Sequence, residues 1–135
     1  MSVDEALAVL ESLRPERKGL RSVVEERNGL AGMVLEHHEG AERWAAVSTP
    51  GTGWFTLQLD GGFMYDIVDE DASSEEIREI LQHLIAIGQA YLEGKSELTT
   101  SRFLKAPTRI VQLGDQRIRI HLSLDKLWRR IWGRS

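Results

Sequence analysis

The sequence contains no cysteine among its 135 residues and only three prolines. Without cysteine there is no disulfide, no thiolate nucleophile and no cysteine-ligated zinc or iron–sulfur site. The sequence also lacks a run of 18 or more apolar residues, so we expect no membrane-spanning helix and no membrane partner. The first residues, MSVDEALAVLESLRPERKG, carry acids early and show no signal-peptide pattern of basic and then apolar residues. These absences favour a cytoplasmic protein.

The common catalytic and ligand-binding motifs are missing as well. The sequence has no G-x-S-x-G, no P-loop and no H-E-x-x-H pattern. A calcium loop that began at Asp69 would need glycine at its sixth position and glutamate at its twelfth, where the sequence has Ser74 and Ile80. Because His37 and His38 are adjacent in an expected strand, they would point to opposite faces and not share a metal ion. We therefore expect no metal, no cofactor, no catalytic residues and no enzymatic activity.

What the sequence does contain is the composition and periodicity of a folded domain. Its length and its 41% of hydrophobic residues predict a single domain over residues 1–135. Apolar spacing of three and four residues predicts a short helix from residue 3, a long one over residues 74–93 and a short one over 123–132. Ser2 with Glu5, and Ser73 with Glu76, match the capping box that starts a helix.

Short alternating segments between these helices predict strands. Four or five strands precede the long helix and two follow it, while KSELTTSRFLKAP (residues 95–107) is predicted to be a loop. Asn28-Gly29 favours a tight hairpin turn. The pattern predicts an α+β fold, in which an antiparallel β-meander of about six strands is covered by one long helix, with short N- and C-terminal helices. Leu57, Ile80 and Leu84 are expected in its core.

The charge is unevenly distributed along the chain. Residues 1–94 hold 18 acidic and 7 basic residues, whereas residues 95–135 hold 3 acidic and 10 basic ones. The stretch LDGGFMYDIVDEDASSEEIREI (residues 59–80) alone has eight carboxylates and one arginine. The two parts either complement each other within the fold or present surfaces of opposite sign to partners.

Helix capping explains only some of these acids. Asp71, Glu75 and Glu76 stand at the expected start of the long helix, where the helix dipole favours each anion by about 0.3–1 kcal/mol. Four further acids, Asp60, Asp66, Asp69 and Glu70, precede the helix, and Asp66 interrupts an apolar strand. Together with Asp71 and an exposed tryptophan they form a candidate partner-binding surface, because interfaces use aromatic anchors and complementary charge. Its residues are Trp54, Asp60, Asp66, Asp69, Glu70 and Asp71. A merely solvated acidic surface explains the same acids equally well.

The basic end of the chain predicts no nucleic-acid site. Trp128 and Trp132 fall on the apolar stripe of the expected last helix, and the chain as a whole carries a net charge of -4. An acidic protein is a poor nucleic-acid binder by bulk charge, so we expect no nucleic-acid partner.

Residues 43–94 resemble the small immunity proteins of bacterial polymorphic toxin systems, in particular the immunity protein 61 family. The resemblance rests on the W-x-x-x-[ST] strand at residues 44–48, GWFTLQLDGG at 53–62, the acidic DED at 69–71 and the helix end AYLEG at 90–94. It implies a non-enzymatic cytoplasmic protein that binds and neutralises a cognate toxin, which is often encoded beside it. We expect such a protein to be a monomer or a weak homodimer.

The order of the expected elements also resembles secretion-chaperone-like domains. That resemblance implies a dimer that holds an extended segment of another protein. A tight complex with one folded toxin domain would indicate the first class, and a dimer that binds an unfolded segment would indicate the second.

Overall fold

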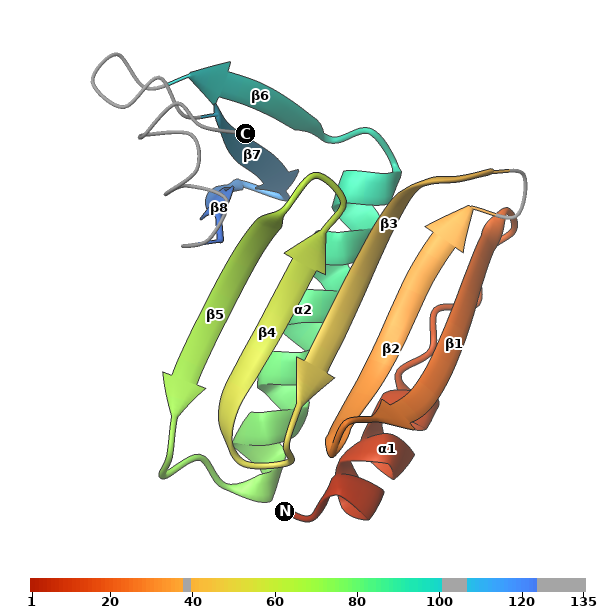
Figure 1. Cartoon of the computed structure of the whole chain (residues 1–135), viewed down its shortest axis with the longest axis vertical. Coiled ribbons are helices and arrows are strands. Elements are labelled where there is room, and N and C mark those ends of the chain that lie inside the picture. Colours follow the sequence, from red (N-terminus) through yellow and green to blue (C-terminus); the bar gives the residue numbers. More distant parts are fainter. Residues whose placement is uncertain (38–39, 101–106, 124–135) are drawn as a thin grey trace.

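The computed structural model describes residues 1–37, 40–100 and 107–123 (Figure 1). They form an α+β fold with one eight-stranded antiparallel sheet and two helices. The elements are α1 (Val3–Ser12), β1 (Leu20–Arg27), β2 (Leu30–His37), β3 (Gly40–Thr49), β4 (Gly53–Leu59), β5 (Phe63–Asp69), α2 (Ser74–Leu92), β6 (Ser96–Thr100), β7 (Pro107–Leu113) and β8 (Gln116–Leu122).

The strand order is β1-β2-β3-β4-β5-β8-β7-β6, which confirms an antiparallel α+β sheet and corrects its details. The sheet has eight strands in the described residues, where about six were expected, and they form two meanders, β1–β5 and β6–β8. Helix α2 then carries the chain to the far edge, so that β8 lies next to β5. The expected C-terminal helix lies outside the described residues.

The loop predicted at residues 95–107 is wrong in its first part, because Ser96–Thr100 is strand β6. Its sequence, SELTT, contains a single apolar residue, Leu98, and therefore shows no alternation of apolar and polar side chains. Backbone pairing with β7 makes it a strand, with Ser96 opposite Val111 and Thr100 opposite Pro107. An edge strand of this kind leaves little hydrophobic signal in the sequence.

Both predicted capping boxes are confirmed. The Ser2 hydroxyl accepts a hydrogen bond from the Glu5 backbone N–H at 3.1 Å, and the Glu5 carboxylate accepts one from the Ser2 N–H at 3.3 Å. Ser73 and Glu76 repeat this arrangement at 3.2 and 3.1 Å. The hydrogen bonds from the two serines lower the pKa of both glutamates.

Both helices pack on the same face of the sheet (Figure 1). Alternation along β4 sends Phe55, Leu57 and Leu59 into the core that they share with α2. Leu57 and Leu84 are fully buried, as expected. Ile80 is only partly buried, so the expectation of a core residue is wrong there: it lies at the flank of the buried stripe of α2.

The sheet consists of two parts that meet at a narrow junction. Strands β5 and β8 pair only through Phe63 with Leu122 and through Met64 with His121. In Figure 1, β6 and β7 run at a steep angle to β5, so the two parts diverge beyond this junction. The divergence leaves most of β5 without a neighbouring strand on its β8 side among the described residues.

Candidate partner-binding surface

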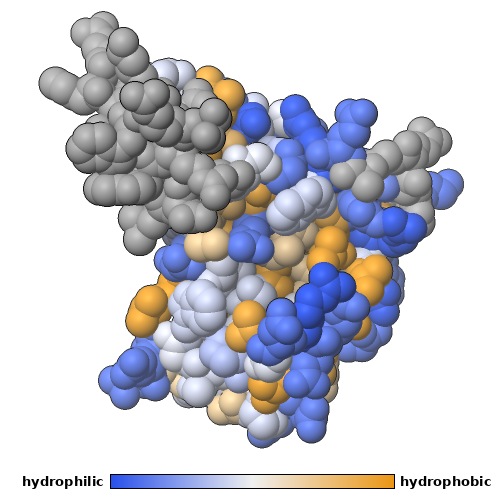
Figure 2. Space-filling view, in the orientation of Figure 1, coloured by the Kyte–Doolittle hydropathy of each residue, from blue (hydrophilic) through white to orange (hydrophobic). Residues whose placement is uncertain are grey.

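The face of β1–β5 opposite the helices carries no other element of the described chain. We call the residues of these strands that point to this side the open face, which in Figure 1 lies in front of α2. Figure 2 shows apolar groups on it among polar ones. Trp54 is 41% exposed and Val68 is 70% exposed, and the β4–β5 register places them directly opposite each other. Since most large apolar side chains among the described residues are buried, this pair is a marked exposure of apolar surface.

A hollow of about 220 Å³ lies farther across the open face, over β1–β3. Small residues, Gly32, Ala46 and Ser48, line it together with the polar side chains of Glu25 and Gln58. Neighbouring strands place these short side chains next to one another, because Gly32 pairs with Ser48. The hollow can accept one projecting side chain of a partner, and its lining offers no nucleophile with a base.

Asp66 is the one acid of the predicted set that joins Trp54 on the open face. It is exposed, lies two residues along β5 from Val68 on the same face, and is opposite Thr56. The Thr56 hydroxyl donates a hydrogen bond of 2.6 Å to Asp66 Oδ1. This bond explains how an acid is tolerated in the middle of an otherwise apolar strand, and it leaves the second carboxylate oxygen without a partner among the described residues.

Three further predicted acids form the turn from β5 to α2. Asp69 Oδ1 accepts a hydrogen bond of 3.1 Å from the Asp71 backbone N–H, a local bond that shapes the turn. Glu70 and Asp71 are exposed. Because Asp69 pairs with Gly53, this acidic turn lies at the same end of the hairpin as Trp54.

Asp60 has a different position and role. It is half-buried at the opposite end of the β4–β5 hairpin, where its Oδ1 accepts hydrogen bonds from the Trp44 backbone N–H at 2.9 Å and from the Tyr91 hydroxyl at 2.8 Å. The structure thus brings Trp54, Asp66 and the acidic turn together and sets Asp60 apart as a residue that holds the fold.

A cluster around Tyr91 was not found from the sequence. The guanidinium carbons of Arg43 and Arg109 lie 5.5 and 5.4 Å from the centre of its ring, and Arg109 also lies 5.7 Å from that of Phe63. Burial, and then the hydrogen bond to Asp60, raise the pKa of Tyr91 to about 12. A phenol with such a pKa is a poor acid or base near neutral pH. No local pattern reveals this cluster, because its members come from distant parts of the chain.

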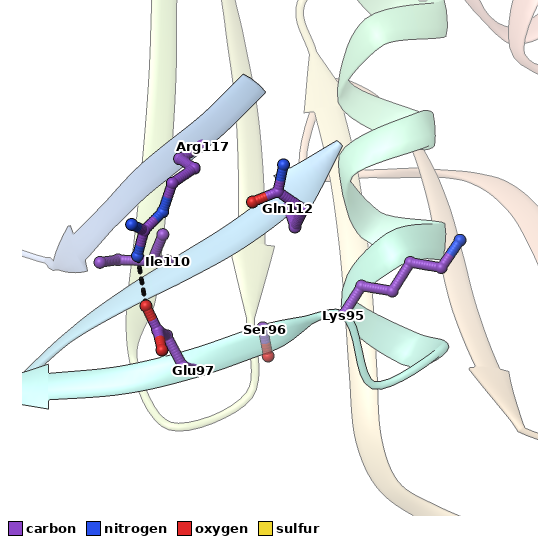
Figure 3. Close-up of a pocket in the computed structure, with 6 residues that line it drawn as sticks. All are labelled: Lys95, Ser96, Glu97, Ile110, Gln112 and Arg117. Carbon is purple, nitrogen blue, oxygen red and sulfur yellow. Dashed lines mark hydrogen bonds and ion pairs between the residues drawn. The ribbon is translucent and has the colours of Figure 1, made fainter. Parts of the chain in front are cut away.

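A second hollow, of about 390 Å³, lies on β6–β8 (Figure 3). Its lining is polar: Glu97 and Arg117 form an ion pair across it, while the Lys95 side chain points away. Gln112 and Ser96 are its other polar groups. It offers an ion-paired surface and no arrangement of nucleophile, base and oxyanion donors.

Within residues 1–37, 40–100 and 107–123, no three or more His, Asp or Glu side chains are placed to hold a metal ion. His37 Nε2 instead lies in hydrogen-bond contact with the Leu92 carbonyl, at 2.7 Å. No helix in this described part is long and apolar enough to cross a membrane.

The fold and its surface define the class: an α+β protein whose antiparallel sheet is covered by helices on one face and leaves an apolar and acidic area on the other. Comparisons of the chain with protein-family models, with curated proteins and with solved structures gave no match.

Proposed function

We propose that this protein is an immunity protein, which binds and neutralises a cognate toxin in the cytoplasm of the producing cell. The contact is made by the β4–β5 part of the open face. The observation that supports it is the exposed pair of Trp54 and Val68, which lies beside the carboxylate of Asp66 on an uncovered sheet. Interfaces concentrate their energy in a few aromatic and aliphatic anchors surrounded by polar groups.

The acids make this surface selective for a basic partner. Asp66 and the turn of Asp69, Glu70 and Asp71 surround the apolar pair with negative charge. A toxin that acts on nucleic acid carries basic groups where the phosphates bind, because phosphate contacts depend on Lys and Arg. Complementary charge then speeds association of the two proteins. The bound immunity protein covers the toxin's own ligand site.

Binding is a better account of these acids than acid/base chemistry. Asp66 and Asp69 each accept a hydrogen bond from within the hairpin or its turn, and neither lies in one of the hollows described above. A catalytic carboxylate pair needs a cleft in which desolvation and mutual charge separate the two pKa values. On the open face Asp66 is exposed instead of enclosed.

The test is a binding measurement with the purified product of the neighbouring open reading frame. We expect calorimetry to give one-to-one binding, and co-expression to restore growth of cells that carry the toxin. Trp54→Ser should weaken binding by about tenfold or more, which is the effect of removing an interface anchor. Leu98→Ser is the matched control, because Leu98 is an apolar residue 54% exposed on β6, away from the open face of β1–β5.

Two results would contradict the proposal. Absence of a complex, together with a stable dimer that captures extended peptides, would indicate a secretion-chaperone-like function. Equal losses of binding for Trp54→Ser and Leu98→Ser would show that the toxin does not select the β4–β5 surface.

A further inference from the structure

Strand β5 has a free edge whose direction follows from the hydrogen bonds of its neighbours. In an antiparallel sheet, the backbone groups of successive residues point alternately to the two sides of a strand. The backbone N–H of Asp60, the residue that follows β4, donates to the Trp44 carbonyl of β3. Because the direction alternates along the strand, the even-numbered residues of β4 also bond to β3. Its odd-numbered residues therefore bond to the odd-numbered residues of β5 that oppose them, Phe63, Tyr65 and Ile67.

The even-numbered residues of β5 consequently turn their N–H and C=O groups away from β4. The Ser123 N–H donates to the Gly62 carbonyl at 2.8 Å, which fits this parity. Met64 faces His121 of β8, and the pairing ends there. Farther along, the N–H and C=O groups of Asp66 and Val68 point to the same side, and no described strand lies opposite them.

Strand β1, at the outer edge of the sheet, has an edge that is partly blocked by hydrogen bonds from within the chain. Along β1, the Leu20 N–H donates to the Arg17 carbonyl at 3.2 Å. The Arg14 guanidinium donates to the Ser22 carbonyl at 2.5 Å and to its hydroxyl at 3.0 Å. Such contacts prevent pairing with another chain. At Asp66 and Val68 no described group acts in this way, and Val68 exposes apolar surface instead.

We propose that the free edge of β5 from Asp66 to Val68 receives an extended segment of the toxin as an added strand. This inference rests on the proposed function and specifies how the partner is held. Main-chain hydrogen bonds to Asp66 and Val68 supply the attachment, as in other cases of strand addition. Side chains that alternate along the segment supply the specificity: a basic residue faces Asp66 and an apolar residue faces Val68.

Charge distinguishes this occupant from a second copy of the same chain. Two β5 edges that paired antiparallel around Asp66, Ile67 or Val68 would set Asp66 of one copy directly or diagonally beside a carboxylate of the other, either Asp66 or Glu70. Like charges at such positions destabilise a strand pair. A toxin segment with Lys or Arg opposite Asp66 gives attraction at the same place.

Hydrogen exchange at single amides tests the inference, first on the free protein. Tyr65 and Ile67 bond to β4 and should exchange slowly, whereas the Asp66 and Val68 amides should exchange fast. Slow exchange at Asp66 and Val68 in the free protein would mean that the edge is already occupied and would overturn the inference. On adding the purified toxin, we expect exchange at Asp66 and Val68 to slow by about tenfold or more.

Two variants at Val68 then distinguish the contribution of its backbone N–H to binding from that of its side chain. Val68→Pro changes the side chain and, of the main-chain hydrogen-bonding groups of β5, removes only the Val68 N–H, which points to the free edge, a place where a sheet tolerates proline. Val68→Thr keeps that N–H and the branched shape. We expect Val68→Pro to weaken binding of the toxin by about tenfold or more and Val68→Thr to weaken it clearly less.

The outcomes separate the two proposals. If the toxin binds but leaves exchange at Asp66 and Val68 unchanged, strand addition is wrong and the proposed function stands. If the two variants bind equally well, the main-chain contact is again wrong. If the toxin does not bind at all, the proposed function fails and the inference fails with it.

Discussion

The phenolic hydroxyl of Tyr91 donates a hydrogen bond of 2.8 Å to Asp60 Oδ1, and this bond joins the end of the long helix to the β4–β5 turn. The same oxygen accepts the Trp44 backbone N–H, so one carboxylate ties α2, β3 and the hairpin together. Asp60 thus shows what one of the eight acids in residues 59–80 does. Some of its acids hold the fold, and others, such as Asp66 and Glu70, lie exposed at the surface.

We predict that Tyr91→Phe lowers the free energy of unfolding by about 1–3 kcal/mol, because it leaves a half-buried carboxylate with one donor fewer. Urea denaturation measures this change. Tyr65→Phe is the control, because Tyr65 is partly buried and its hydroxyl has no hydrogen-bond partner within the described chain. Equal effects of the two substitutions would show that the bond to Asp60 contributes nothing.

Stability should also depend on pH through Tyr91. Burial and the bond to Asp60 raise its pKa to about 12, whereas an unfolded tyrosine titrates near 10. The fold therefore favours the neutral phenol. Its contribution is fully present below about pH 10 and is lost as the pH rises from about 10 to 12.

Denaturation of the wild type and of Tyr91→Phe over this pH range measures that contribution, since the titration of the lysines is common to both proteins. The wild type should lose more stability than the variant as the pH rises. Parallel curves would contradict the assignment of this pH dependence to Tyr91.

The close contact between α2 and β3 predicts whether Gly88→Ala raises or lowers the stability of the protein. A Cβ atom at Gly88 would lie 3.1 Å from the Ala45 Cβ and 3.5 and 3.6 Å from Leu35 and Leu57. Alanine favours the helix over glycine by about 1 kcal/mol, but a Cβ cannot rotate away from its neighbour, and overpacking costs about 1–3 kcal/mol. We expect a net loss of stability in thermal or urea unfolding.

A double-mutant cycle checks the cause of that loss. Ala45→Gly removes the opposing Cβ, so Gly88→Ala should cost less in its presence than in the wild type. An unchanged cost would place the strain elsewhere, at Leu35 or Leu57.

The features predicted correctly from the sequence are those that depend on nearby residues. Both capping boxes need residues only three positions apart, and the Asn28-Gly29 turn needs two residues that accept positive φ, here 55° and 79°. Strand β6 was missed because Ser96–Thr100 is nearly all polar and is specified by its pairing with β7. The site was predicted in part for the same reason. Trp54 and the acids are visible in the sequence, but their relation to Val68 depends on the register of the hairpin, and the free edge depends on where β8 diverges from β5.

Charge reversal at Asp69 and Glu70 distinguishes acids that hold the fold from acids that meet a partner. Both residues precede α2, outside its first turn, and Asp69 contributes one hydrogen bond to the Asp71 N–H. We predict that Asp69→Lys with Glu70→Lys changes the free energy of unfolding by about 1 kcal/mol or less, because single exposed bonds and charges contribute little.

The same double variant should weaken toxin binding strongly, and most of all at low salt, where opposite charges attract over the longest range. Asp60→Lys is the contrasting change, because it places a positive charge where two donors converge and should unfold the protein. Urea denaturation compares the stability of the two variants, and calorimetry at two salt concentrations compares the binding of the Asp69 and Glu70 double variant with that of the wild type. If the double variant unfolds as Asp60→Lys does, the acids of the turn are structural, and the partner surface is reduced to Trp54, Asp66 and Val68.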